Sequence, residues 1–192
     1  MRATALPPDE RRAAIVSATI PLLITHGPAV TTRQIAEAAG IAEGTIFRVF
    51  ADKDALLEAA IDTAFDPAPL VAALGTIDLG LPLAARLETA AEMLQRRVTD
   101  IWQLMSATGQ VKPPHAGHAK TGRPDLTALA ALFAPDAERL TRPPLEAAHL
   151  LRGLVFAGTH PALIIDDPLT PHDIVSVLLD GLRARPSDIE NR

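Results

Sequence analysis

The chain has 192 residues, of which 48% are hydrophobic and only 3% aromatic, and it carries a net charge of −5 and no cysteine. This composition supports a folded protein with an aliphatic core, and it excludes disulfides, thiolate catalysis and zinc sites of the cysteine type. The negative charge argues against a protein that coats nucleic acid through bulk positive charge.

No segment approaches the roughly 20 apolar residues that a membrane-spanning helix needs. The longest apolar stretch, LVFAGTHPALII, is short and contains a histidine and a proline. The first residues, MRATALPPDERR, lack the apolar run of a signal peptide. We therefore expect a cytoplasmic protein with no membrane partner.

The first predicted helix covers PPDERRAAIVSATIPLLITHG. Asp9 is a candidate N-cap, and Gly27 is a natural end. Pro21 lies inside the pattern and removes one backbone hydrogen bond. We therefore expect a kink near residues 17–20 or two shorter helices.

The second predicted helix, residues 31–39, has a strong start signal. Thr31 and Gln34 have the spacing of a capping box, and Val30 and Ile35 have the spacing of a hydrophobic staple. These pairs predict a helix that begins at a defined residue even though it is short.

A third predicted helix, about residues 42–49, follows almost at once after Gly40, which stands where a left-handed residue would end the preceding helix. Asp52 then opens a fourth helix that continues to about residue 65. Two short helices joined by a glycine-containing turn form a helix-turn-helix. Such pairs also occur as plain packing units, so the pattern alone leaves DNA binding open.

The stretch from Pro67 to Pro82 is a break in composition and the predicted boundary between two parts of the chain. No convincing strand and no internal repeat occur, so the predicted class is all-α. Beyond the break we expect a long helix over 83–108, a loop over 109–124 and helices at about 125–133, 144–160 and 171–185.

The last two predicted helices are apolar on most of their faces. A surface helix shows one apolar stripe, so helices of this kind must be covered on several sides. A second subunit in a symmetric homodimer would supply the cover. The alternative is a central core helix within one subunit.

The run TTRQIAEAAGIAEGTIFRVFADKDALL, preceded by RRAAIVSATIPLL and HGPAVT, resembles the DNA-binding head of the TetR family of bacterial regulators over residues 9–62. Three positions depart from the family pattern: Ala42 replaces a capping Ser or Thr, Phe47 replaces a Tyr, and Pro21 is unusual in the first helix. The residues in register are Thr31 or Thr32, Ile35, Ala36, Ala39, Gly40, Gly44, Thr45, Phe50, Lys53 and Leu56.

The resemblance implies an N-terminal three-helix helix-turn-helix head, residues 1–52, and a C-terminal helical bundle for ligand binding and dimerisation, residues 53–192. The helix from Lys53 to about Phe65 would connect them. The implied function is a transcriptional regulator, most often a repressor, that binds a palindromic operator as a homodimer and is released by a ligand. The alternative is a helical ligand-binding or interaction module whose head does not bind DNA.

The resemblance also assigns DNA contacts. The start of the second helix would hold the DNA backbone, the third helix would lie in the major groove with Arg48 on a guanine, and Lys53 would clamp a phosphate. Glu43 could accept from a cytosine amino group or simply face solvent. The full predicted set is Thr31, Thr32, Arg33, Glu43, Gly44, Thr45, Phe47, Arg48 and Lys53.

The C-terminal part of this family usually encloses a small-molecule pocket. Several side chains of the C-terminal helices could line one here and would favour a small, mainly apolar effector, although ordinary core packing is the alternative for each. The predicted lining residues are Trp102, Met105, Phe133, His149, Leu150 and Leu154.

No catalytic, cofactor or metal-binding motif occurs in the sequence, so we expect neither an enzyme nor a bound cofactor. His115 and His118 have metal-like spacing but no further ligand nearby. Residues 1–65 hold six cationic and eight acidic side chains, a net charge of −2. Because few cations are available to touch phosphates, we expect weak non-specific DNA binding.

Overall fold

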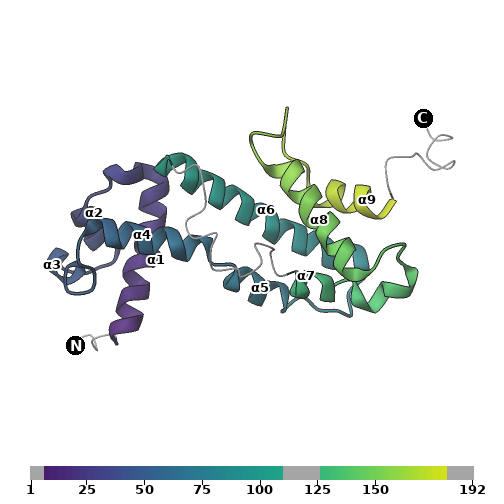
Figure 1. Cartoon of the computed structure of the whole chain (residues 1–192), viewed down its shortest axis with the longest axis horizontal. Coiled ribbons are helices and arrows are strands. Elements are labelled where there is room, and N and C mark those ends of the chain that lie inside the picture. Colours follow the sequence, from purple (N-terminus) through teal and green to yellow (C-terminus); the bar gives the residue numbers. More distant parts are fainter. Residues whose placement is uncertain (1–6, 110–125, 181–192) are drawn as a thin grey trace. The chain divides into compact units, whose positions relative to one another are not determined.

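The computed structural model describes residues 7–109 and 126–180, which are helical with no strand (Figure 1). The all-α prediction is therefore confirmed for this part of the chain. The chain divides into an N-terminal unit, residues 1–66 with 100–122, and a C-terminal unit, residues 67–99 with 123–192. None of the described helices is both long and apolar enough to cross a membrane.

The N-terminal unit contains the predicted helix-turn-helix. Helix α1 packs against α2 and α4, and α2 packs against α3. Leu104, near the end of α6, is buried in the same hydrophobic core. The elements of this unit are α1 (Pro8–His26), the 3-10 helix η1 (Gly27–Ala29), α2 (Thr32–Ala38), α3 (Glu43–Ile46), α4 (Lys53–Phe65) and the last part of α6 (Leu83–Thr108).

Helix α1 differs from its prediction at both points of interest. It begins at Pro8, with Pro7 as its N-cap residue, so the N-cap prediction for Asp9 was wrong. Proline suits the first helical position, where its missing N–H is not needed. The helix also continues through Pro21 as one element, so the alternative of two shorter helices was wrong. Burial of Leu23, which is 0% exposed, holds the helix together beyond the proline.

The start of α2 confirms the capping prediction. The Thr31 hydroxyl accepts from the backbone N–H of Gln34 at 3.2 Å, and the backbone N–H of Thr31 donates to the Gln34 side chain at 2.8 Å. Both members of the hydrophobic staple, Val30 and Ile35, are fully buried. Gly40 has a φ of +66°, the left-handed conformation that was expected there.

Helix α3 is shorter than predicted, because it has one turn, Glu43–Ile46, in place of residues 42–49. Its N-cap residue, Ala42, has no side chain that could cap the helix. Beyond the helix the backbone tightens, with the N–H of Arg48 donating to the carbonyl of Thr45 at 3.2 Å. Asp52 then caps α4 by accepting from the N–H of Ala55 at 2.8 Å, as predicted.

The C-terminal unit holds an α-helix and a 3-10 helix that the sequence pattern did not predict. Helix α5 (Ala68–Leu74) lies within the stretch read as a break, with Pro67 and Pro69 at its start, where a missing N–H costs nothing, and Leu74 buried. The helix predicted at 125–133 is shorter, and the predicted loop falls mainly on residues outside the described ranges. The other elements are the first part of α6, α7 (Thr127–Ala131), the 3-10 helix η2 (Ala134–Arg139), α8 (Pro144–Thr159) and α9 (Pro171–Asp180).

Polar contacts tie α6 to the rest of this unit. Arg86, which is 2% exposed, donates to the carbonyl of Leu79 at 2.5 Å and forms an ion pair with Asp136 of η2. A buried charge is tolerated only when it is paired in this way. Gln95 donates to the Thr159 hydroxyl at 3.0 Å at the end of α8.

Helix α9 is capped and joined to α6 at the surface. The Thr170 hydroxyl accepts from the N–H of Asp173 at 3.1 Å and donates to its carboxylate at 2.6 Å, and this hydrogen bond lowers the pKa of Asp173. His172 lies 2.9 Å from the Glu88 carboxylate, and the hydrogen bond between them raises the pKa of His172.

The turn at Gly27 yields a stability prediction. Gly27 has a φ of +56° and ψ of −150°, and a Cβ at this position would lie 2.5 Å from the carbonyl oxygen of Ala107. Because only glycine adopts this backbone conformation readily, Gly27→Ala should destabilise the protein by about 2 kcal/mol or more in urea unfolding. The control is Gly44→Ala, since a Cβ at Gly44 has no neighbour within 4 Å. Equal stability of the two variants would contradict this interpretation.

Candidate nucleic-acid interface

The predicted DNA-contacting residues of α3 lie on the side that faces solvent. Glu43, Gly44 and Arg48 are exposed, and Thr45 is half-buried. Phe47 is 51% exposed, which is unusual for a large apolar side chain. The intervening core residues, Ile46 and Phe50, are 0% and 3% exposed. Helix α3 and the residues just after it therefore have a buried face and an exposed face that is polar apart from Phe47.

The start of α2 lies beside the start of α3. Thr31 and Arg33 are exposed, and Thr32 is half-buried. The Thr32 hydroxyl donates to the Glu43 carboxylate at 2.5 Å, so the two helix starts are directly bonded. This contact was not among the roles considered for Glu43 from sequence, because nothing local relates two residues that far apart in the chain.

Lys53 is oriented by a backbone carbonyl. Its ammonium group donates to the carbonyl oxygen of Pro28 at 2.7 Å, which links the start of α4 to η1. An ammonium has three N–H donors, so two remain for other acceptors. The hydrogen bond to Pro28 therefore fixes where the Lys53 ammonium group lies, and its contact with a phosphate stays a prediction.

Arg12 of α1 contacts the segment that follows α3. Its guanidinium lies 4.3 Å from the centre of the Phe50 ring, a cation–π contact between α1 and the segment after α3. This pair could not be predicted from the sequence, because the two residues are far apart in the chain and share no local motif. The contact fixes the segment after α3, which carries Arg48.

The predicted effector-binding residues are divided between the two units. Trp102 and Met105 belong to the N-terminal unit and are half-buried on α6. In the C-terminal unit, Phe133 is 1% exposed within the core, whereas His149 and Leu150 are exposed on α8 and Leu154 of the same helix is half-buried. Their role in binding an effector stays a prediction.

Comparison with known proteins finds a match to a family model within the N-terminal unit. Residues 15–60 match the sequence model of the family described as bacterial regulatory proteins, tetR family. This confirms the resemblance, and the N-terminal unit carries the helix-turn-helix domain of that family. No curated protein matches the chain.

Solved structures share the fold over most of the chain. A candidate TetR-family regulator from Mesorhizobium loti aligns with a TM-score of 0.62 at 20% identity, covering 91% of this chain and 98% of its own. The TetR regulator SCO0520 from Streptomyces coelicolor gives 0.57 at 23%, covering 90% and 98%. LfrR from Mycobacterium smegmatis, solved in complex with proflavine, gives 0.53 at 23%, covering 92% and 99%.

The bond between Thr32 and Glu43 can be measured by a double-mutant cycle. Thr32→Val and Glu43→Ala should each weaken the free energy of unfolding slightly and should couple by about 0.5–1.5 kcal/mol, because either change removes the same hydrogen bond. The control cycle pairs Thr32→Val with Glu37→Ala, an exposed acid of α2, and should show no coupling. A coupling free energy between Thr32 and Glu43 as small as that of the control pair would refute the contact.

Proposed function

We propose that the protein is a transcriptional regulator that binds a palindromic DNA operator as a homodimer and leaves it when a small, mainly apolar effector binds. The observation that supports this most directly is the exposed polar face of α3 within a helix-turn-helix domain of the TetR family. The proposal goes further than the family match in four respects: the operator, the repression, the dimer and the ligand.

The shape of α3 suits the major groove. The groove is about 12 Å wide and admits one helix. Gly44 has open space around the position of a Cβ, so the backbone can approach base edges closely. Thr45, Phe47 and Arg48 would follow the groove floor. Because α3 has a single turn, Arg48 lies just beyond its end and is the residue best able to reach a guanine with two hydrogen bonds.

Groups around α3 would hold the phosphates on both sides. Thr31 and Arg33 lie at the start of α2, and the two remaining donors of Lys53 lie at the start of α4. These contacts would fix the register of α3 without reading sequence. The acidic balance of residues 1–65 favours a protein that binds weakly to unrelated DNA.

The surface of α8 supports a homodimer. Leu145 and Phe156 are 59% and 47% exposed, and with His149 and Gly153 they follow the spacing of one helix face. Apolar side chains exposed together on one face mark a contact surface. The middle of this face is Gly153, whose missing side chain would let a second helix approach closely. A symmetric pair would bury the face in both subunits.

The acidic head supports one alternative, in which the protein binds ligands or partners but not DNA. Net charge −2 over residues 1–65 is low for a DNA-binding head. Ala42 and Phe47 also lack hydroxyl groups that could bond phosphates. DNA binding at low salt decides between the two functions.

Arg48 provides the test of DNA recognition. In a gel shift with the DNA upstream of its own gene, Arg48→Ala should weaken binding about 10–100-fold through the lost guanine contact. Arg142→Ala is the control, since Arg142 is an exposed arginine of the C-terminal unit. The thermal stability of both variants should stay unchanged. Failure of the native protein to bind at any salt concentration would favour the alternative function.

Gly153 provides the test of the dimer. Gly153 is exposed and a Cβ there has no neighbour within 4 Å, so Gly153→Trp should leave the fold intact and block the second copy. Sedimentation at about 10 μM, far above the nanomolar range of stable dimers, should show a dimer for the native protein and a monomer for the variant. Glu138→Trp, on the exposed side of η2, is the control and should remain dimeric. A native protein that sediments as a monomer would refute the dimer.

A further inference from the structure

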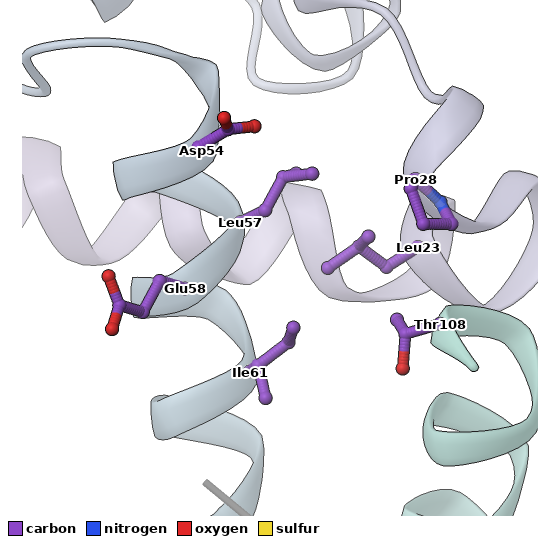
Figure 2. Close-up of a pocket in the computed structure, with 7 residues that line it drawn as sticks. All are labelled: Leu23, Pro28, Asp54, Leu57, Glu58, Ile61 and Thr108. Atoms are coloured by element: carbon purple, nitrogen blue, oxygen red, sulfur yellow. The ribbon is translucent and has the colours of Figure 1, made fainter. Parts of the chain in front are cut away.

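The N-terminal unit contains a hollow of about 390 Å³ beneath the start of α4 (Figure 2). A volume of this size falls within the usual range of small-molecule pockets. It belongs entirely to the unit that carries the helix-turn-helix and includes none of the effector residues predicted from sequence. Its lining comes from α1, η1, α4 and the end of α6, and consists of Leu23, Pro28, Asp54, Leu57, Glu58, Ile61 and Thr108.

The walls of the hollow are apolar. Leu23, Leu57 and Ile61 are 0%, 9% and 7% exposed, and Figure 2 shows these side chains pointing toward one another from α1 and α4. Thr108 adds a hydroxyl that already donates to the carbonyl of Leu104 at 2.7 Å. A ligand held here would therefore gain most from an apolar body.

Both charged residues among the described lining residues are acidic. Asp54 and Glu58 lie one turn apart on α4, and no cationic side chain is among the lining residues. Figure 2 shows the Glu58 carboxylate pointing outward from α4, whereas the Asp54 carboxylate lies at one end of the hollow. A positive group beside Asp54 would complement this charge, and a carboxylate ligand would be repelled.

The same end of the hollow is connected to the candidate DNA surface. Pro28 forms part of the wall, and its carbonyl accepts the hydrogen bond from Lys53 at 2.7 Å. Pro28 can move little toward α6, because the adjacent Gly27 is so close that a Cβ on it would lie 2.5 Å from the carbonyl oxygen of Ala107. A group wedged between Pro28 and Asp54 would therefore move the start of α4 and Lys53 with it.

We propose that this hollow binds an amphipathic organic cation, with its apolar body against Leu23, Leu57 and Ile61 and its ammonium group beside Asp54. Occupation of the hollow displaces Lys53 and weakens DNA binding. Only this second statement rests on the proposed function. Binding and DNA affinity then oppose each other reciprocally, as two coupled sites must.

Three probes with one apolar body and different head groups test the site. They are 4-phenylbutylammonium, the neutral 4-phenylbutanol and the anionic 4-phenylbutyrate, titrated into the full chain while methyl NMR signals of Leu23, Leu57 and Ile61 are followed. The ammonium should bind with a dissociation constant of about a millimolar, as expected for so small a ligand. It should bind at least about five-fold more tightly than the acid. Absent methyl shifts, or equal binding of acid and ammonium, would overturn the site.

Two matched variants locate the charge. Asp54→Asn should weaken binding of the ammonium about five-fold and leave the alcohol unchanged, because only the attraction to the charge is lost. Glu58→Gln removes the same charge one turn away and should have a much smaller effect. Equal losses in both variants would show diffuse attraction to α4 and refute Asp54 as the anchor. Thermal unfolding of each variant confirms that the unit is folded.

The link to DNA is tested separately. At a 4-phenylbutylammonium concentration near its dissociation constant for the native protein, operator binding should weaken measurably in the native protein and clearly less in Asp54→Asn, whose site is then mostly empty. If the probe binds but DNA affinity does not change, the coupling through Lys53 is refuted and the site stands. If the protein binds no DNA at all, the proposed function fails, whereas the NMR titration still decides the site.

Discussion

The structure of the N-terminal unit depends on the burial of a few aliphatic and aromatic side chains beneath a very short helix. A single helical turn is unstable in water by itself, because its nucleation is costly and little is gained in return. Helix α3 persists because Ile46 and Phe50 are buried against α1, α2 and α4. The exposure of Gly44 and Arg48 on the other side is a consequence of that burial. The positions of the exposed polar groups therefore depend on the packing of the core beneath them.

Polar contacts then fix the orientation of the surface more finely than hydrophobic burial can. Thr32 is bonded to Glu43 between two helix starts, Lys53 is bonded to Pro28, and the Arg12 guanidinium covers the Phe50 ring. Each contact joins segments that are separate in the chain. Lys53 is bonded to Pro28, which lines the hollow under α4, so the proposed ligand site and the proposed phosphate contact share one residue.

The C-terminal unit shows the opposite balance. Arg86 is buried and paired with Asp136, and the core around it is well covered, yet α8 leaves Leu145 and Phe156 in solvent. Within the described residues of this unit, no other element covers that face of α8. The excess of apolar surface on α8 therefore supports association, whereas the charged surface of α2 and α3 supports contact with a polar partner.

The sequence by itself determined the features that depend on neighbours a few residues apart. The capping box of Thr31 and Gln34, the left-handed Gly40 and the cap at Asp52 were all readable because each involves one turn of backbone, and so were the all-α class and the helix-turn-helix. Tertiary structure decided the rest: α1 continues through Pro21, α3 ends after one turn, and α5 forms between prolines. These outcomes depend on which distant side chains bury or bond a segment, and that free energy is absent from any local pattern.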